Sequence, residues 1–204
     1  ILGAFFVLSI SSWYLLKNRH ESMAKKMFNT ALGLALLASL AAPISGHFQA
    51  ETVSRTQPAK LAAFEGHFHT GEGGTPLYLF GVPDEEEQVV HGGLAIPGLL
   101  SLLVHHDLNT PVTGLDQIPR EDWPPVNMAF QSYHIMASFG MFFVLVSMLG
   151  VFFVWRGTLL KHRWFLWINV FTVLGAYLAN QAGWVAAEVG RQPWIVWGEL
   201  RTND

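Results

Sequence analysis

The 204-residue chain contains no cysteine and few charged residues, since only 13% of its residues are Asp, Glu, Lys or Arg. The absence of cysteine excludes disulfides and thiolate metal sites. A soluble domain usually has about a quarter charged residues, whereas here 51% of residues are hydrophobic and the mean hydropathy is +0.32. The composition therefore predicts a membrane protein.

Several common motifs are also lacking. The sequence contains no P-loop, dinucleotide-binding fingerprint, HExxH motif or nucleophile elbow. Its net charge of −3 argues against a nucleic-acid partner. The chain starts at Ile1 inside an apolar run with no basic region before it, so we expect a fragment of a longer gene product rather than a signal peptide.

Apolar residues are concentrated in four blocks. The blocks are Ile1–Leu16, Met27–Ser45, Asn127–Trp155 and Trp164–Glu188. A membrane-spanning helix needs ~20 residues at ~1.5 Å rise each. The last three blocks therefore predict complete spans and the first a partial one. The expected fold class is all-α, a polytopic transmembrane helix bundle with about four membrane helices and a long extracytoplasmic loop.

The charges predict which side of the membrane each connection occupies. Seven of the twelve Lys and Arg residues lie in the two short connections between blocks. The positive-inside rule places these connections in the cytoplasm. Residues 46–126, which separate them, contain eleven acidic and three basic residues, a net charge of −8. This long segment is therefore predicted to lie outside the cytoplasm.

The predicted organisation has four parts along the chain. Within the long loop, Leu94–Val104 is apolar but too short to span, so it predicts a short interfacial helix. The parts are residues 1–45 (a partial and a second transmembrane helix), 46–126 (the loop), 127–194 (two transmembrane helices) and 195–204 (an outer tail leading to a further helix).

Glu188 ends the fourth apolar block, about one membrane thickness from Trp164. A carboxylate at the end of such a segment is costly and by default indicates a functional site. It is either an interfacial carboxylate paired with Arg191 or an anionic ligand to a cation or metallocofactor. A transporter or channel fragment with Glu188 in an ion pathway is an alternative function.

Met136 lies about eleven residues into the third block, ~16 Å below the outer surface. Methionine in a membrane helix usually serves packing, but a thioether can also be an axial ligand of haem. His134 is two residues earlier, on a different face, and alone is the more obvious ligand candidate. No other histidine lies within a predicted span, so a bis-histidine haem site is not expected.

Lys60 and Glu65 are five residues apart, ~140° around a helix, and so are not an i,i+4 surface pair. From two sides of a turn they could converge on one small polar molecule. An ammonium can donate to a carbonyl or phenolic oxygen and a carboxylate can accept its proton, which is the chemistry of quinol oxidation. The alternative is a loop Lys and Glu without a role. The pairs His67/His69 and His105/His106 are weaker candidates for metal binding.

Five sequence elements occur in a characteristic order along the chain. They are Gly46-His-Phe-Gln49, Gln57-Pro-Ala-Lys-Leu-Ala-Ala-Phe-Glu65, Tyr78-Leu-Phe-Gly-Val-Pro83, Tyr133-His-Ile-Met136 and Ala182-Gly-Trp-Val-Ala-Ala-Glu-Val-Gly-Arg-Gln-Pro-Trp194. Together they closely resemble subunit I of the cytochrome bd-type quinol:oxygen oxidases. The resemblance covers essentially the whole chain, and the second and last elements are the most specific.

The resemblance implies roles for individual residues. Met136 would be an axial ligand of a low-spin haem b, and Glu188 a ligand of a high-spin haem b that neighbours haem d. Lys60 and Glu65 would be the quinol-site pair in the loop that the family calls the Q-loop. Three residues would have supporting roles, namely Gln57, Trp184 and Arg191.

The resemblance also implies a bacterial cytoplasmic-membrane location, quinol and oxygen as substrates, and a second membrane subunit as partner. Many family members have Arg at the position of His134, so a positive charge near the haem is lost or made pH-dependent here. The loop is of the short type. Members have further helices before and after this region, bearing the other haem ligands, so the fragment alone is not expected to reduce oxygen. A non-catalytic assembly subunit is a second alternative.

Overall fold

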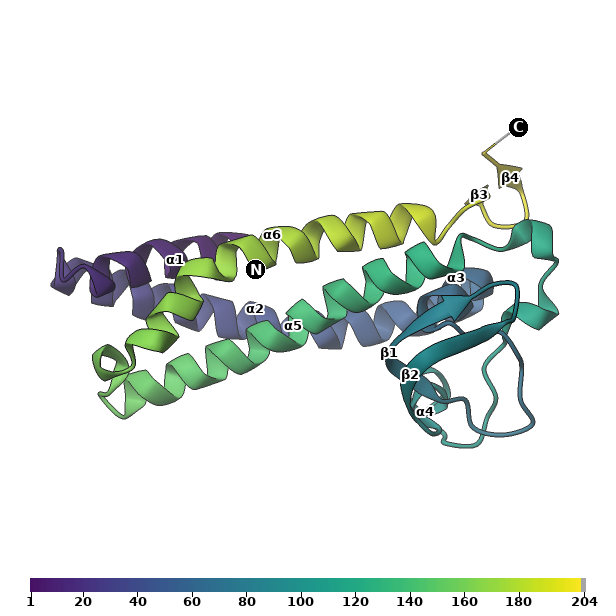
Figure 1. The fold of residues 1–204 in the computed structure, drawn as a ribbon, viewed down its shortest axis with the longest axis horizontal. Coiled ribbons are helices and arrows are strands. Elements are labelled where there is room, and N and C mark those ends of the chain that lie inside the picture. The colour runs from purple at the N-terminus through teal and green to yellow at the C-terminus, as the bar shows by residue number, and fades with distance from the viewer. Residues whose placement is uncertain (203–204) are drawn as a thin grey trace. The chain divides into compact units, whose positions relative to one another are not determined.

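The computed structural model describes residues 1–202, which fold into helices and two short β-hairpins (Figure 1). The chain forms two compact units, Ile1–Ile44 with Met136–Gln181, and Ser45–Ile135 with the residues from Ala182 onward. The helices are α1 (Leu2–Leu16), α2 (Glu21–Thr56), α3 (Pro58–Glu65), α4 (Leu99–His105), α5 (Val126–Trp155) and α6 (Arg163–Val189), with single 3₁₀ turns at Leu115–Gln117, Arg120–Asp122 and Leu159–Lys161. The strands are β1 (Leu77–Asp84), β2 (Val89–Ile96), β3 (Trp194–Val196) and β4 (Leu200–Arg201).

The first unit is a bundle of four helical segments from α1, α2, α5 and α6. Their buried side chains form one apolar core, in which the rings of Phe5 and Phe143 lie 4.4 Å apart. Ser9 of α1 donates a hydrogen bond to the carbonyl oxygen of Val170 in α6. Because these uniformly apolar helices satisfy their own backbone hydrogen bonds, packing of their side chains holds the bundle together.

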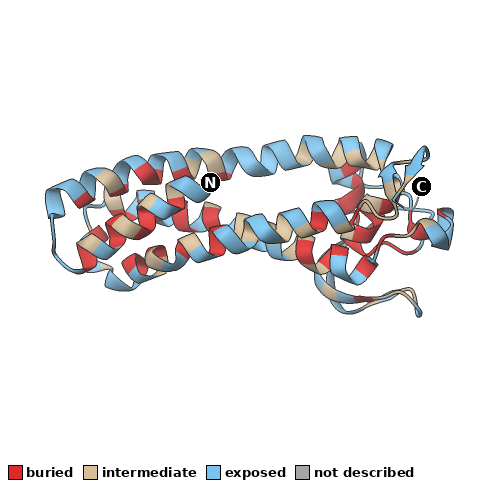
Figure 2. Ribbon diagram, turned by 90° about the horizontal axis from the view of Figure 1, so that it is seen from above, coloured by how far each residue is buried: buried red, intermediate tan, exposed pale blue. Residues whose placement is uncertain are grey.

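The outward faces of the bundle are strongly apolar, and Figure 2 shows long exposed stretches on these helices. Leu37, for example, is 68% exposed and Met141 is 60% exposed. Soluble proteins rarely leave apolar surface of this extent uncovered. A lipid environment or further protein therefore accounts for the exposed faces.

Two described helices, α2 and α5, are long and apolar enough to cross a membrane. Helix α1 is apolar but has only 15 residues. Helix α6 has 27 residues, but Asn169, Asn180 and Gln181 interrupt its apolar sequence. Four membrane helices therefore stay a prediction, although all four predicted blocks are helical.

The second unit contains the connecting segment between α2 and α5, here defined as residues 57–125. Strands β1 and β2 form an antiparallel hairpin within it, with Leu77 opposite Ile96 and Asp84 opposite Val89. The expectation of an all-α chain is corrected by this hairpin. Its strands contain β-favouring residues such as Tyr78, Phe80 and Val82, but a proline in β1 and two glycines in β2 interrupt the strand pattern.

The predicted interfacial helix at Leu94–Val104 is only partly helical. Its first three residues belong to β2, and helix α4 begins at Leu99. Pro97 lacks an N–H donor and disfavours helix in the residue before it, and Gly98 adopts a left-handed conformation with φ of 70°. These two residues therefore divide the apolar run into a strand and a helix.

Helix α2 does not end near Ser45, where the second apolar block ends, but continues through Pro43 to Thr56. The predicted loop therefore begins with a helical extension. The predicted outer tail from residue 195 contains parts of β3 and β4. Its residues 203 and 204 lie outside the described residues.

Candidate functional site

Helix α3 is short, and its sequence specifies both ends. Pro58 occupies the first turn, where a missing N–H costs nothing, and Gln57 is the N-cap residue. Gly66 ends the helix with φ of 60°, and a Cβ there would lie 2.9 Å from a methyl carbon of Val90. The backbone N–H of His67 donates to the carbonyl of Ala62 across this end. Lys60 and Glu65 thus lie on one continuous helix rather than around a turn.

Lys60 lies next to the C-terminal end of α6. Its ammonium donates a hydrogen bond to the carbonyl oxygen of Ala187 over 3.2 Å. Partial burial lowers the pKa of Lys60, and the positive charge of Arg191 lowers it further, while Glu188 raises it. The charged ammonium form of Lys60 is therefore less strongly favoured over the neutral amine than it is in water, and it lies close to the charges of Arg191 and Glu188.

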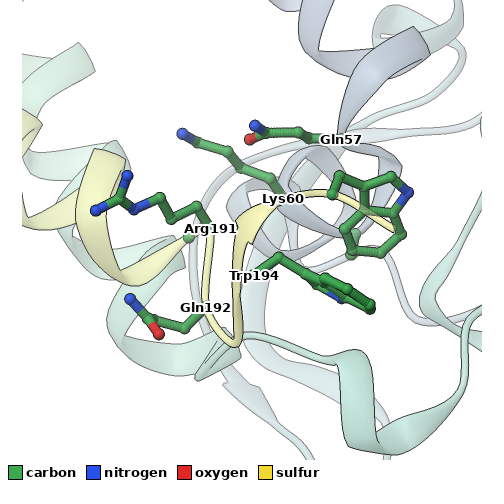
Figure 3. Close-up of a pocket in the computed structure, with 8 residues that line it drawn as sticks. Gln57, Lys60, Arg191, Gln192 and Trp194 are labelled. Carbon is green, nitrogen blue, oxygen red and sulfur yellow. The ribbon is translucent and has the colours of Figure 1, made fainter. Parts of the chain in front are cut away.

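A shallow pocket, called the Lys60 cavity below, lies beside Lys60 and is lined by two segments far apart in the sequence, and it encloses almost no space even for a water molecule. Figure 3 shows the side chains of Gln57, Lys60 and Arg191 extending toward the same side, with the ring of Trp194 on the other. The cavity therefore combines hydrogen-bond donors with aromatic surface. Its lining residues are Gln57, Ala59, Lys60, Gly190, Arg191, Gln192, Trp194 and Trp197.

Gly190 allows α3 to approach the end of α6 closely. A Cβ at this position would lie 2.5 Å from a ring carbon of Phe64. The Phe64 ring also lies 5.6 Å from the Lys60 ammonium and stacks on Tyr133 with centroids 4.8 Å apart. Phe64 therefore contacts both Lys60 and Tyr133, the neighbour of Glu65.

Glu188 is bound to Arg191. The two side chains form an ion pair of 2.6 Å at the end of α6, and the Glu188 side chain is 50% exposed. Arg191 donates to Oε2, and no described residue donates to the other oxygen. The predicted pairing with Arg191 is therefore present, and one carboxylate oxygen is open to a further ligand. Trp184 lies one turn earlier on the same face of α6 and is 64% exposed.

Glu65 is buried, with 2% of its surface exposed. The Tyr133 hydroxyl is its hydrogen-bonding neighbour, and Oε2 has no partner among the described residues. Burial raises the pKa of Glu65 to about 8, and the interaction with Tyr133 opposes this only in part. At neutral pH the side chain is therefore mainly a neutral carboxylic acid.

The structure does not bring Lys60 and Glu65 to one cavity. Glu65 is not among the lining residues of the Lys60 cavity. Because five residues along an α-helix rotate the side chain by ~140°, the two side chains leave α3 in different directions. Gln57 and Arg191 are the predicted site residues that join Lys60 in the cavity.

His134 and Met136 lie on opposite sides of α5, because two residues along a helix rotate the side chain by ~200°. The two ring nitrogens of His134 lie 2.9 Å from the carbonyl oxygens of Phe130 and Tyr78. His134 thus connects α5 to strand β1 of the hairpin. Met136 is half-buried and belongs to the first unit.

Sequence reasoning missed several residues that the structure places at the site. Tyr133, the neighbour of Glu65, was noticed only as part of the element ending at Met136. Gln192 and Trp194 belong to the quoted motif at the end of α6, but only Arg191 was selected from it. Trp197 lies beyond that motif, and no sequence pattern marks it.

Comparison with known proteins gives a consistent result. The whole chain, residues 1–204, matches the family Cytochrome bd terminal oxidase subunit I. It is 32% identical over 209 residues to the cytochrome bd ubiquinol oxidase subunit 1 of Bacillus subtilis (strain 168), covering 98% of this chain and 45% of that protein. It is 26% identical over 267 residues to the cytochrome bd-II ubiquinol oxidase subunit 1 of Escherichia coli (strain K12), covering 99% of this chain and 52% of that protein.

The fold is also that of a solved oxidase. The bd oxidase structure from Geobacillus thermodenitrificans matches with a TM-score of 0.87 and 35% sequence identity, covering 100% of this chain and 46% of that chain. The chain thus spans about half the length of the relatives it matches. With a family match along its full length and the same fold, the chain belongs to the cytochrome bd terminal oxidase subunit I family.

Proposed function

We propose that the chain is part of the catalytic subunit of a respiratory oxidase that oxidises quinol and reduces oxygen to water. The cavity that gathers Gln57, Lys60 and Arg191 beside two tryptophan rings carries the proposal. Relatives named as ubiquinol oxidase subunits support it. The substrate would be a quinol, whose ring is flat and apolar and whose two hydroxyl groups need polar partners.

The cavity residues fit such a substrate by their chemistry. Lys60 and Gln57 would donate hydrogen bonds to quinol oxygens, and Trp194 or Trp197 would contact the ring face. Ligand pockets usually have ~300–1,000 Å³, whereas the Lys60 cavity encloses almost no free space, so it must widen to admit a quinol. Displacement of the Arg191 and Gln192 side chains, which line the cavity, would admit the ring.

Glu65 would relay protons released from the quinol: its carboxyl group would first release its own proton outward, and the carboxylate would then take up one from the quinol. Oxidation of a quinol to a quinone releases two protons and two electrons. A base is most effective when its pKa lies near the working pH, and burial raises the pKa of Glu65 to about 8. Because Glu65 is not on the Lys60 cavity, we propose that its proton arrives through the hydroxyl of Tyr133 or through a rearrangement of α3.

The donor atoms at Met136 and Glu188 fit haem iron. Glu188 keeps one carboxylate oxygen without a hydrogen bond from any described residue, and the half-buried Met136 offers a thioether. We propose that Met136 would hold a low-spin haem b and Glu188 a high-spin haem b, and that the complete oxidase would also contain a haem d. These groups would supply the electron acceptors and the site of oxygen reduction. Arg191 would balance the Glu188 charge, and Trp184 and His134 would lie beside the haems.

The location and partners follow from the same proposal. The protein would cross the bacterial cytoplasmic membrane several times, with residues 57–125 on the outer side as a Q-loop. A second membrane subunit would cover part of the exposed apolar surface. Met136 and Glu188 each supply one donor to a haem, so the oxidase needs further ligands from the rest of the full-length subunit.

Quinol-dependent oxygen consumption by membranes that carry the full-length protein tests the proposal. Glu65→Gln keeps the size of the side chain but cannot accept a proton, so we expect a loss of about 10²-fold or more with an unchanged reduced-minus-oxidised haem spectrum. Glu72→Gln, an exposed residue of the same segment, is the matched control and should retain full activity.

Two results would contradict the proposal. Full activity of Glu65→Gln would remove Glu65 from proton transfer. A well-expressed full-length protein without haem absorbance would instead favour the ion-pathway function for Glu188. The haem spectrum and the oxygen consumption therefore test the two parts of the proposal separately.

A further inference from the structure

Two histidines and a glutamate form a compact cluster in the second unit, apart from the Lys60 cavity. His47 and Glu51 lie on successive turns near the C-terminal end of α2, and His106 is the C-cap residue of α4. One ligand atom from each lies within 4.8 Å of the other two. Both histidines approach the same carboxylate oxygen, Oε1 of Glu51, with Nε2 at 3.4 Å for His47 and 2.7 Å for His106.

These distances are close to those of a tetrahedral metal site. Zinc is bound at ~2.0–2.1 Å by histidine nitrogen and carboxylate oxygen, which places neighbouring ligand atoms ~3.3 Å apart. The separation of 3.4 Å between His47 and Glu51 already fits. The separation of 2.7 Å between His106 and Glu51, a hydrogen bond in this structure, has to widen by about 0.6 Å. Small side-chain rotations are therefore enough to admit the ion.

The ligand types favour zinc or a similar transition metal over calcium or magnesium. Imidazole nitrogen suits zinc, copper and nickel, whereas calcium and magnesium prefer sets of oxygen ligands. Two histidines with one glutamate leave a fourth position for water, as in the open type of zinc site. The Glu51 side chain is 23% exposed and that of His106 is 66% exposed, so an ion can enter from solvent.

The backbone conformation of His106 is a second, independent observation. This residue has φ of 56° and ψ of 21°, a left-handed conformation that glycine usually occupies at the end of a helix. A side chain other than glycine in this conformation costs free energy, and such residues concentrate at functional sites. In this conformation the imidazole Nε2 of His106 lies 2.7 Å from Oε1 of Glu51. An exposed ion pair of ~0–1 kcal/mol gives little reason to maintain it.

A second cluster in the same unit fits a metal less well. Asp84, Glu87 and His91 also bring ligand atoms within 4.8 Å of one another. Here Oδ1 of Asp84 already accepts hydrogen bonds from two backbone N–H groups, and His91 lies 4.0 Å from the other oxygen. With one histidine and a carboxylate occupied by its own turn, this cluster serves as the control.

We propose that His47, Glu51 and His106 form a binding site for Zn²⁺ or a similar divalent transition-metal ion. The ion would link the end of α2 to the end of α4. These two helix ends already share an apolar core with α3, in which Val53 of α2 packs beside Leu61 and Leu100. The metal would therefore stabilise the packing around the segment that carries Lys60.

Zinc binding by the purified full-length protein tests this site without relying on oxidase activity. The protein is stripped with a chelator, equilibrated with ZnCl₂ in the presence of excess Mg²⁺, and assayed for bound zinc. We expect the wild-type protein to bind one more equivalent of zinc than His47→Gln or His106→Gln. If these variants still bind this equivalent, their affinity for it should be at least tenfold lower. His105→Gln, which changes the histidine next to His106, and His91→Gln should bind zinc like the wild type.

Thermal unfolding provides the second measurement. ZnCl₂ should raise the Tm of the wild type and of His105→Gln, but not that of His106→Gln or Glu51→Gln, while the metal-free forms should unfold at similar temperatures. Equal zinc binding by all variants, or a loss in His91→Gln alone, would overturn the site. Failure of the quinol oxidase proposal would leave these results unchanged, because neither readout depends on quinol or haem.

Discussion

At the residue scale, Glu65 has an unusual environment for a carboxyl group. It is buried in an apolar core with Tyr133 as its polar neighbour, and its pKa is raised from 4.5 to about 8. Desolvation penalises the charged form, so the neutral acid is the stable species at pH 7. The same burial that makes Glu65 a suitable proton acceptor therefore makes its ionisation costly to the fold.

This cost predicts a pH-dependent stability. The folded protein binds the Glu65 proton more tightly than the unfolded chain, so the contribution to stability is complete below pH 4.5 and is lost as the pH rises to about 8. Glu65→Gln has no carboxyl group at this position and should not show this pH-dependent loss. Relative to the variant, the free energy of unfolding of the wild type should fall by at most about 1.4 kcal/mol per pH unit in this range.

Thermal unfolding of the purified full-length protein at several pH values measures the effect. The Tm of Glu65→Gln should fall less steeply than that of the wild type between about pH 5 and about pH 8. Glu72→Gln is the control and should follow the wild type. Parallel curves for wild type and Glu65→Gln would show that Glu65 is ionised at little cost.

Met136 leads to a spectroscopic prediction. Leucine has a similar volume and apolarity but no sulfur, so Met136→Leu should preserve packing while removing the proposed axial ligand. We expect the low-spin haem to change its absorbance or its reduction potential in a redox titration of full-length protein. Met141→Leu, at a 60% exposed position of the same helix, should leave both unchanged. An unaltered low-spin haem in Met136→Leu would exclude Met136 as the ligand.

At the scale of the elements, the contact between α3 and the end of α6 depends on a missing side chain. A Cβ on Gly190 would lie 2.5 Å from the ring of Phe64. Gly190→Ala should therefore destabilise the protein by about 1–3 kcal/mol through overcrowding. It should also weaken quinol oxidation, because Gly190 lines the Lys60 cavity.

A second substitution separates crowding from other effects. Phe64→Leu removes the ring, so the double variant should recover part of the Tm lost in Gly190→Ala. Gly140→Ala in α5 is the control, since a Cβ there meets no atom within 4 Å and should be neutral or slightly stabilising. If Gly190→Ala unfolds like Gly140→Ala, the close packing of Phe64 is not important.

The sequence predicted the long helices much better than the connecting segment. The ends of the predicted blocks 127–155 and 164–188 differ from the ends of α5 and α6 by no more than one residue. Uniform apolar runs of membrane length have few alternatives to helix. The hairpin β1–β2 depends instead on pairing between two segments whose β-favouring residues are interrupted by proline and glycine.

The roles of the candidate site residues stay a prediction, while the arrangement of Lys60 and Glu65 differs from the expected one. Gln57, Lys60 and Arg191 do line one cavity. Glu65 does not line this cavity. Helix α3 is continuous from Pro58 to its end at Gly66, so the side chains of Lys60 and Glu65 stay ~140° apart around the helix. Helix ends and glycine contacts of this kind depend on tertiary structure and cannot be predicted from the spacing of two residues alone.

At the scale of the whole molecule, the charge distribution is asymmetric along the chain. Residues 46–126 have eleven acidic and three basic residues, whereas the short connections on either side hold seven of the twelve Lys and Arg. The positive-inside rule predicts that these basic connections lie in the cytoplasm. The hairpin β1–β2 and α3 would then lie on the outer side.

The absence of cysteine from the chain makes this topology measurable, because any thiol introduced into it is the only one there. Val89→Cys, in β2 at a position 42% exposed, and Leu160→Cys, in the basic connection at 40%, form a matched pair. They are placed in a full-length protein whose other cysteines, if any, are replaced, and intact cells are treated with a membrane-impermeant maleimide. Val89→Cys should react in intact cells and Leu160→Cys only after permeabilisation. The reverse pattern would place Lys60 and its cavity on the cytoplasmic side and remove the proposed outward release of protons, even if quinol oxidation itself were demonstrated.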